Sequence, residues 1–304
     1  MKKFTYNKSG RTAEKHRLTS WLVSEPAELM EFLMDKMPAK GRNNIKSLLT
    51  HRQVMVGDTV VTQYNHPLQS GQEVIVNWSL VRDQAHIKGL KVIYEDSELI
   101  VINKPAGLLS IASDSEKQNT AYHQLTDYVR INDPNNRIFI VHRLDRDTSG
   151  IMLFAKNEAI KHLLQDAWKE LVTDRAYVAV VEGRVTKQTD KIKSWLLETK
   201  TKMMYSGSKP GDGLEAITHY KMLQANDKYS LLEIRLETGR KNQIRVHMKD
   251  IGHSIIGDKK YGSTTNPIGR LGLHAHILAF HHPVTGEIMR FETEVPKTFA
   301  RLFK

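Results

Sequence analysis

The nine residues HRLDRDTSG, at positions 142–150, lie between two apolar segments at 138–141 and 151–155. Short apolar segments bounded by polar residues are typical of buried strands. A loop held between two strands is a common place for binding and catalytic side chains. The alternative is a plain turn with surface ion pairs, which contribute little to stability. We expect a functional loop here.

Asp145 is the central acid of this loop, with Arg143 and Arg146 close by in the chain. Positive charge nearby favours the ionised form of a carboxylate. An ionised aspartate suits nucleophilic or electrostatic work at a sugar carbon better than it suits proton donation. Asp147 is a candidate for the second carboxylate of a glycosidase-like pair. Residues two apart in an extended segment lie on the same side and leave no room for a sugar between them, so this pair is disfavoured.

A second polar cluster, TGRKNQIRVH at 238–247, follows a strand-like alternation at 232–237 and leads into a helical pattern. A basic segment that opens a helix offers an anion both free backbone N–H groups and side-chain charge. Arg245 falls near the start of this predicted helix, where it can bind a carboxylate or a phosphate through two parallel hydrogen bonds. A basic surface turn is the alternative.

The composition of the 304 residues points to a nucleic-acid partner. Lys and Arg number 45 against 34 Asp and Glu, which gives a formal net charge of +11. Such an excess favours a polyanion, and no apolar run is long enough to cross a bilayer. The absence of cysteine excludes disulfides, thiol nucleophiles and thiolate metal sites. Because the start of the chain lacks the apolar core of a secretory signal, we expect a cytoplasmic protein.

Histidines recur at 274, 276, 281 and 282, which suggests a metal site at first sight. No carboxylate or cysteine completes a known ligand pattern around them. Neither the phosphate-binding loop of nucleotide enzymes nor the glycine pattern of dinucleotide-binding folds is present. We therefore expect neither a metal nor a cofactor.

The front of the chain carries a basic run that contains no acid. Between positions 36 and 57 the cations are Lys36, Lys40, Arg42, Lys46 and Arg52. Two apolar-periodic segments, 28–37 and 42–51, predict short helices, and 54–61 with 72–76 predict a hairpin and a further strand. Arg42 and Lys46 are four positions apart and project from one helix face. We expect this face to bind phosphate; a solvated face on a structural domain is the alternative.

From Leu90 onward, strand patterns alternate with short helices without a strict strand–helix–strand order. Strands at 91–94 and 99–103 form a hairpin, and helices are predicted at 121–130 and 157–170. This pattern indicates α+β architecture, with a mixed, mainly antiparallel central sheet and flanking helices. The expected organisation is an N-terminal extension at 1–23, a small α/β domain at 24–82 and a large domain at 88–304.

Several segments resemble the RluA-type RNA pseudouridine synthases, in the order in which that family carries them. They are NKPAGLL at 103–109, HRLDRDTSGIMLFAKN at 142–157, RAYVAVVEG at 175–183, TGRKNQIRVHMKDIGHSIIGDKKYG at 238–262 and GLHAHILAFHHPVTGE at 272–287. The resemblance covers about residues 90–296. The two helices of 24–82, with VMVGDTVV and GQEVIV behind them, resemble the RNA-binding module named after ribosomal protein S-four.

This resemblance implies an isomerase with the pseudouridine synthase fold that converts uridine in structured RNA to pseudouridine without a cofactor. By position, Asp145 is the essential aspartate, and Tyr177 stacks on the uracil and helps to remove its ring proton. Arg245 pairs with Asp145, and Arg143 fills the space left by the extruded base. The target base must leave its stack first. The predicted RNA contacts are Arg143, Lys40, Arg42, Lys46, Arg52 and Arg240.

The chain departs from the family pattern at three places near these residues. Asn242 replaces a histidine, Arg175 a frequent lysine, and Ser254 a proline. A catalytically inactive RNA-binding or ribosome-assembly factor on the same fold is the alternative function, and a nuclease or glycosidase is a third. We expect ribosomal RNA as substrate before transfer RNA, and a monomer.

Overall fold

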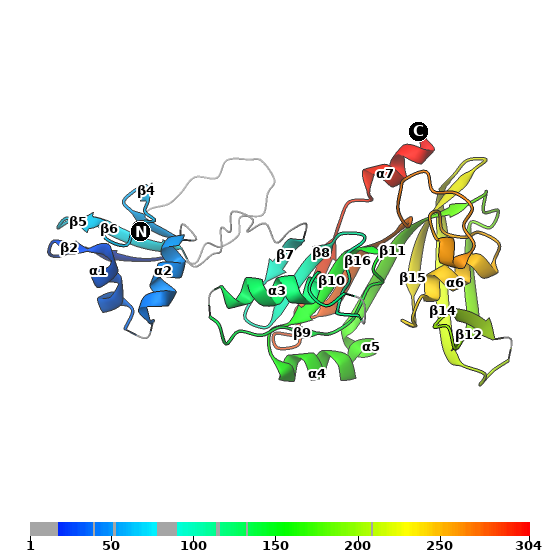
Figure 1. Cartoon of the computed structure of the whole chain (residues 1–304), viewed down its shortest axis with the longest axis horizontal. Helices are drawn as coiled ribbons and strands as arrows, with labels where there is room; N and C mark the ends of the chain where they lie inside the picture. Colours follow the sequence, from blue (N-terminus) through cyan, green and yellow to red (C-terminus); the bar gives the residue numbers. More distant parts are fainter. Residues whose placement is uncertain are drawn as a thin grey trace. The chain divides into compact units, whose positions relative to one another are not determined.

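The computed structural model describes residues 18–38, 40–50, 53–77, 90–113, 116–131, 133–207 and 209–304. They divide into two compact units, a small one up to Asn77 and a large one from Leu90 on, apart from the short segment Ile131–Pro134 (Figure 1). Each unit has its own hydrophobic core. No described helix is long and apolar enough to cross a membrane.

The small unit is an antiparallel sheet with two short helices. The sheet runs in the order β1 (Leu18–Leu22), β6 (Glu73–Asn77), β3 (Val54–Val56), β4 (Thr59–Val60), and β2 (Ala27–Glu28) pairs with β5 (Pro67–Leu68). The helices are α1 (Leu29–Lys36) and α2 (Arg42–Thr50). Their buried apolar faces, including Ile45 and Leu49, pack in one core with Val54 and Val74. The predicted helices and hairpin are thus present, with bounds shifted by one or two residues.

Strand β1 corrects one predicted boundary, because we expected residues 1–23 to lie outside the small domain. It pairs with β6 from Leu18 opposite Asn77 to Leu22 opposite Glu73. The usual alternation is inverted here: Leu18 and Leu22 are 55% and 69% exposed, whereas Thr19 between them is half-buried. A strand whose leucines face solvent lacks the apolar-in, polar-out signal by which sequence patterns identify strands.

The large unit is built on an eleven-stranded mixed sheet, which confirms the predicted α+β class. In spatial order its strands are β13 (Met204–Gly207), β12 (Thr189–Glu198), β14 (Leu214–Ala225), β15 (Tyr229–Leu236), β11 (Val172–Glu182), β16 (Leu273–His281), β10 (Ser149–Ala155), β8 (Leu99–Lys104) and β7 (Lys91–Glu95). β17 (Ile288–Glu292) pairs with β16, and β9 (Phe139–Ile140) pairs with β10. Among these pairs β10 with β16 is parallel, and the others are antiparallel.

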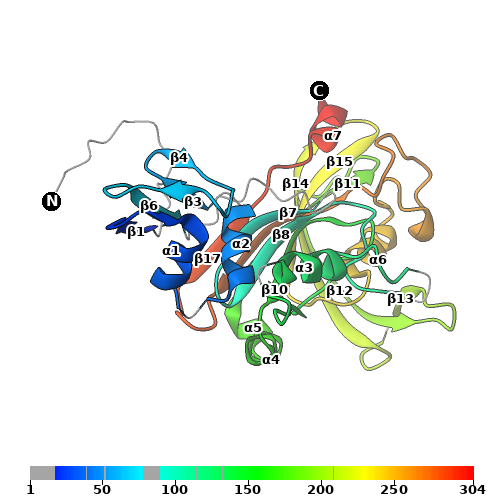
Figure 2. The same ribbon diagram turned by 60° about the vertical axis from the view of Figure 1, so that its left-hand side comes forward.

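Helices cover both faces of this sheet (Figures 1 and 2). The α3 helix (Ala121–Arg130) and the α6 helix (Gln243–Asp250) share a core with Ile100 and Ile102 of β8. The α4 helix (Glu158–Asp166) packs on Leu99 and Val101, the alternate residues of the same strand. Strands buried on both faces lose the polar alternation, which explains the continuous apolar runs of β8 and β10. Short helices complete the unit: α5 (Trp168–Leu171), η1 (Lys259–Tyr261), α7 (Lys297–Ala300) and η2 (Arg301–Phe303).

The helix predicted at 157–170 is divided in two. Asn157 caps its start as expected, since the side-chain oxygen accepts a hydrogen bond from the Ile160 N–H at 2.8 Å. At Ala167 the backbone leaves the helical conformation, and α4 ends before α5 begins. The break turns Trp168 toward His142, with the two ring centres 5.0 Å apart. This ring contact anchors the loop 142–150 to the α5 helix.

Three histidines of the large unit, His142 half-buried and the others buried, are held neutral. Burial lowers the pKa of His142 to about 3, and that of His247 and His274 to about 4. Each has polar partners that suit a neutral ring: His142 Nε2 accepts from the Leu153 N–H at 3.0 Å. His247 and His274 each hydrogen-bond to two hydroxyl groups. The ring nitrogens of His274 are thereby occupied by Ser149 and Thr293.

These histidines make the stability of the large unit fall in mild acid. The unfolded chain takes up their protons below about pH 6.5, whereas the folded protein does so only near pH 3–4. Between those values the free energy of unfolding should fall by up to about 1.4 kcal/mol per pH unit for each histidine. Urea unfolding at several pH values measures the slope. His247→Gln should make it shallower, and His162→Gln, at an exposed position, should not; equal slopes in all three proteins would contradict this account.

Candidate active site

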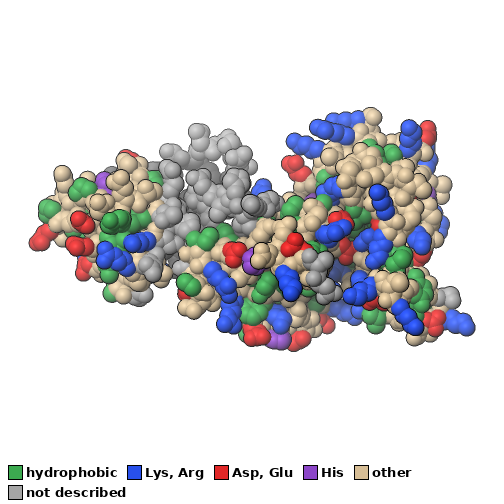
Figure 3. Space-filling model, in the orientation of Figure 1, with side chains coloured by type: hydrophobic (Ala, Val, Ile, Leu, Met, Phe, Trp, Pro, Cys, Tyr) green, Lys and Arg blue, Asp and Glu red, His purple; other side chains and the backbone are tan. Residues whose placement is uncertain are grey.

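The loop 142–150 lines a groove of about 1060 Å³ in the large unit. The other walls come from the strand end and turn at 236–242, the start of α6, strand β11, and α5 with the residues before it. Lys and Arg side chains are frequent on the face of this unit shown in Figure 3, with fewer Asp and Glu among them. The groove is the concave site around the predicted catalytic residues.

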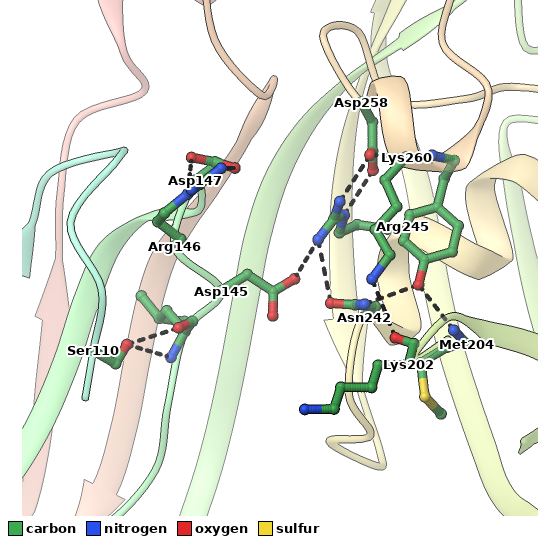
Figure 4. Close-up of polar contacts among 12 residues, drawn as sticks. Ser110, Asp145, Arg146, Asp147, Lys202, Met204, Asn242, Arg245, Asp258 and Lys260 are labelled. Atoms are coloured by element: carbon green, nitrogen blue, oxygen red, sulfur yellow. Dashed lines mark hydrogen bonds and ion pairs between the residues drawn. The ribbon is translucent and has the colours of Figure 1, made fainter. Parts of the chain in front are cut away.

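Asp145 and Arg245, one hundred positions apart, meet at the groove. Arg245 Nη1 donates to Asp145 Oδ2 at 3.0 Å, as the predicted pairing requires. The side chain of Asp145 is 31% exposed and that of Arg245 is 13% exposed, so the carboxylate reaches the groove from a partly buried ion pair. Arg245 lies in the first turn of α6, where its side chain points back toward the loop (Figure 4).

A second carboxylate, which sequence reasoning missed, holds Arg245 from the other side. Asp258 accepts from Nε at 2.7 Å and from Nη2 at 2.8 Å, and its side chain is only 1% exposed. Burial by itself lowers the pKa of Arg245, but the bonds and charges of Asp258 and Asp145 raise it above the ordinary value. The guanidinium is therefore permanently charged and fixed in orientation. In the sequence, Asp258 is an isolated acid after a glycine, and no spacing rule links it to Arg245.

Asn242, one of the departures from the family pattern, belongs to the same cluster. Its Oδ1 accepts from Arg245 Nη1 at 3.2 Å, and its Nδ2 donates to the Tyr261 hydroxyl at 2.8 Å. The Arg245 guanidinium lies 4.9 Å from the centre of the Tyr261 ring. Asn242 has a left-handed backbone with φ of 54°, which asparagine tolerates better than most residues. Figure 4 shows how the cluster surrounds Arg245.

Arg146, although next to Asp145 in the chain, is not hydrogen-bonded or ion-paired to it. It pairs with Asp147 at 3.2 Å, and both side chains point away from the Asp145–Arg245 pair (Figure 4). Residues 145–148 form a turn closed by a hydrogen bond from the Thr148 N–H to the Asp145 carbonyl oxygen at 3.2 Å, and adjacency in this turn does not bring Arg146 to the Asp145 carboxylate. Asp147 does not line the groove, so the structure does not place it with Asp145 as a glycosidase-like pair of carboxylates, which the sequence also disfavoured.

Side chains of the segment 104–110 hydrogen-bond to the backbone of the loop 142–150. The buried ammonium of Lys104 donates to the carbonyl oxygens of Arg146 at 3.0 Å and Leu108 at 2.7 Å. Ser110 Oγ donates to the Leu144 carbonyl at 2.7 Å. Burial lowers the pKa of Lys104 to about 8. The quoted segment NKPAGLL thus supports the loop that carries Asp145, which a motif alone does not reveal.

The remaining predicted residues of the large unit also line the groove. Tyr177, on β11, is 8% exposed, and burial raises the pKa of its phenol, so the hydroxyl stays protonated at neutral pH. Arg143 is exposed at the groove. Arg240 lines it as well, and its Nε donates to the Glu215 carbonyl at 3.0 Å. The groove therefore joins five predicted site residues from three separate segments.

The predicted RNA contacts of the front domain lie in the small unit. Arg42 and Lys46 are exposed on α2, and the Lys46 ammonium lies 5.8 Å from the ring centre of Tyr64. Lys40 is half-buried just before the helix. Arg52 lies outside the described residues. In the part of the chain that the structure describes, no group of three His, Asp or Glu side chains is arranged to hold a metal ion.

Comparison with known proteins identifies the class to which this fold and site belong. Residues 98–250 match the family described as RNA pseudouridylate synthase. The chain belongs to this family: it is an RNA pseudouridine synthase, an isomerase that acts on RNA.

Individual relatives cover most of the chain. An uncharacterized RNA pseudouridine synthase of Bacillus subtilis, YjbO, is 37% identical over 215 residues, 71% of this chain and 76% of its own. The ribosomal large subunit pseudouridine synthase D of Haemophilus influenzae is 32% identical over 295 residues, 90% of this chain and 89% of its own. In fold, the chain is similar to human RNA pseudouridylate synthase domain containing 4, with a TM-score of 0.57 and 22% identity over 69% of this chain and 90% of that one.

Proposed function

We propose that this protein converts one or a few specific uridines of large-subunit ribosomal RNA to pseudouridine, with Asp145 as the essential acid and without a cofactor. The single observation that carries the proposal is the Asp145–Arg245 ion pair at 3.0 Å, on a groove that Tyr177 also lines. The substrate is inferred from the Haemophilus relative, whose name states that it acts on the ribosomal large subunit and which aligns with nearly the whole chain. Ribosomal RNA as substrate is consistent with a cytoplasmic protein.

The reaction breaks the bond between C1′ of the sugar and N1 of uracil and forms one between C1′ and C5. The proton on C5 leaves, and N1 gains one, so the overall composition is unchanged. Asp145, paired with the Arg245 guanidinium, places its carboxylate where C1′ becomes electron-poor. Tyr177 offers the uracil a ring to stack on and a hydroxyl near the proton to be moved. Arg143 is exposed at the groove and can occupy the place of the extruded base.

Site-resolved pseudouridine profiling of ribosomal and transfer RNA, in cells with and without this protein, tests the proposal. We expect one or a few pseudouridines of large-subunit RNA to disappear and to return with the wild-type protein but not with Asp145→Asn. Loss confined to transfer RNA would contradict the proposed substrate. If no pseudouridine changed, the alternative of an inactive ribosome-assembly factor would be favoured instead.

We further propose that residues 24–82, together with strand β1, form an RNA-docking domain and that residues 88–304 form a separate catalytic domain. The support is the acid-free basic run, which the small unit presents partly as exposed Arg42 and Lys46 on one face of α2. Two exposed cations four residues apart suit phosphates of an RNA backbone. Lys40 and Arg52, from the same run, are the further candidates for this contact.

Arg42→Ala combined with Lys46→Ala should weaken RNA binding. Each lost phosphate contact should flatten the dependence of log K on log salt by about 0.7 for single-stranded RNA. Binding titrations of the full chain at four or five salt concentrations measure this slope. Lys36→Ala is the matched control, because its ammonium already pairs with Asp35 at 3.0 Å. A double variant with the wild-type slope would show that this face is only solvated.

A further inference from the structure

Arg175 differs from most other cations of the groove in having no partner within the part of the chain that the structure describes. It lies on β11 two residues before Tyr177, is half-buried, and lines the same groove. No carboxylate or carbonyl of the described residues is hydrogen-bonded to its guanidinium. Other groove cations are satisfied within the chain: Arg245 by Asp145 and Asp258, Arg146 by Asp147, and Lys241 by Glu198.

The guanidinium of Arg175 is nevertheless held in place, by packing. Its central carbon lies 6.0 Å from the centre of the Trp168 ring, and that ring packs in turn on His142. On another side it lies directly on Gly239: a Cβ at this glycine would be 2.9 Å from Nη1 and 3.0 Å from Nη2. The guanidinium therefore occupies space that the side chain of any residue other than glycine would fill.

Packing against an aromatic ring and a glycine leaves the hydrogen-bonding capacity of an arginine unused, because neither neighbour accepts a hydrogen bond from the guanidinium among the described residues. A partly desolvated cation without a partner is unfavourable, because burial removes water that nothing replaces. Such a group is stabilised when an anion arrives, and phosphate accepts two parallel hydrogen bonds from arginine.

We propose that Arg175 binds a phosphate of the RNA backbone next to the target uridine; this inference rests on the proposed action of the groove on RNA. Residues two apart in a strand are about 7 Å apart along it. Arg175 and Tyr177 are therefore spaced to hold the phosphate and the base of neighbouring positions in one strand of RNA. The groove is also lined by Asp166, Glu170 and Glu237, but among the described residues neither these carboxylates nor Asp145 pairs with this guanidinium.

Three variants of the full chain separate charge, shape and position. Arg175→Met removes the charge and keeps the aliphatic bulk; Arg175→Lys keeps the charge but not the paired donors; Gly239→Ala displaces the guanidinium and changes no charge. The probe is an in vitro transcript of large-subunit ribosomal RNA. Dissociation constants are measured across a salt series, and single-turnover pseudouridine formation is measured at saturating RNA.

Arg175→Met should bind the transcript about tenfold more weakly, the scale of one charged hydrogen-bonded contact, and its salt slope should be flatter by about 0.7. Arg175→Lys should keep the wild-type slope with intermediate affinity, and Gly239→Ala should lose affinity as well. Arg184→Met is the matched control, because this exposed arginine pairs with Asp227 and does not line the groove.

A wild-type salt slope for Arg175→Met would overturn the proposal, as would a loss of single-turnover rate with unchanged affinity, which would indicate an effect through Tyr177. The slope depends on binding alone. Wild-type protein that binds the transcript but forms no pseudouridine would therefore contradict the proposed function, while the comparison of slopes would still decide the role of Arg175.

Discussion

Asp145→Asn is expected to reduce pseudouridine formation by at least about 10⁴-fold, the scale seen when an acting residue of an enzyme is removed. The amide keeps the shape of the side chain but carries no charge, so it neither stabilises positive charge at C1′ nor attacks an electron-poor atom. Single-turnover assays on a transcript that the wild-type protein modifies measure the loss. Activity within tenfold of wild type would show that another group does this work.

The fold should survive this substitution. Asp145 is 31% exposed, and Arg245 keeps both hydrogen bonds to Asp258, so no buried charge is left unpaired. Thermal unfolding should therefore differ from wild type by only a few degrees, the equivalent of about 1 kcal/mol. Asp147→Asn is the matched control two positions away: Asp147 pairs with Arg146, does not itself line the groove, and should be dispensable for activity.

Gly150→Ala is expected to prevent the large unit from folding. Gly150 has a φ of +116° and pairs with Lys104 of β8 on one side and Ala275 of β16 on the other. An added Cβ would lie 2.1 Å from the Ala275 carbonyl oxygen, a backbone atom fixed in the centre of the sheet. Relief requires β10 and β16 to separate, which we expect to cost more than about 4 kcal/mol.

The yield of soluble protein and its unfolding in urea measure this effect. Gly252→Ala is the control, because Gly252 also has a positive φ, +81°, but a Cβ there meets nothing within 4 Å. It should cost only about 1 kcal/mol of backbone strain. Equal stability of the two variants would show that the close approach of β10 to β16 is not what requires glycine at position 150.

Periodic segments were predictable because their burial pattern is a local property of the sequence. The α3 helix has the predicted bounds, and the hairpin of β7 and β8 ends within a residue of the predicted one. Asn157 caps α4 as predicted, because a cap needs only the residues of the first turn. The interruption at Ala167 was not predictable, since it depends on how Trp168 packs against His142 in three dimensions.

The resemblance predicted one contact of the candidate site and missed others. The pairing of Asp145 with Arg245 followed from the resemblance and is present in the structure. The hydrogen bonds of Asp258 to Arg245 and of Lys104 to the loop lie in segments that the resemblance covers, but those motifs do not show which of their residues contact each other. The pairing of Arg146 with Asp147 also could not be read from the sequence, because nearness along the chain does not show which way a side chain points.

Strand β16 sits at the middle of the large sheet although it comes late in the chain. It pairs with β10 through Ser149 and Gly150 and with β11 from Val172 to Ala179, so it joins the half that carries Asp145 to the half that carries Tyr177. Until the ribosome has made residues 273–281, β10 and β11 have no common partner to set their distance. During synthesis, then, the groove is among the last parts of the protein to form, and a nascent chain that already holds Asp145, Tyr177 and Arg245 still lacks the arrangement that brings them together.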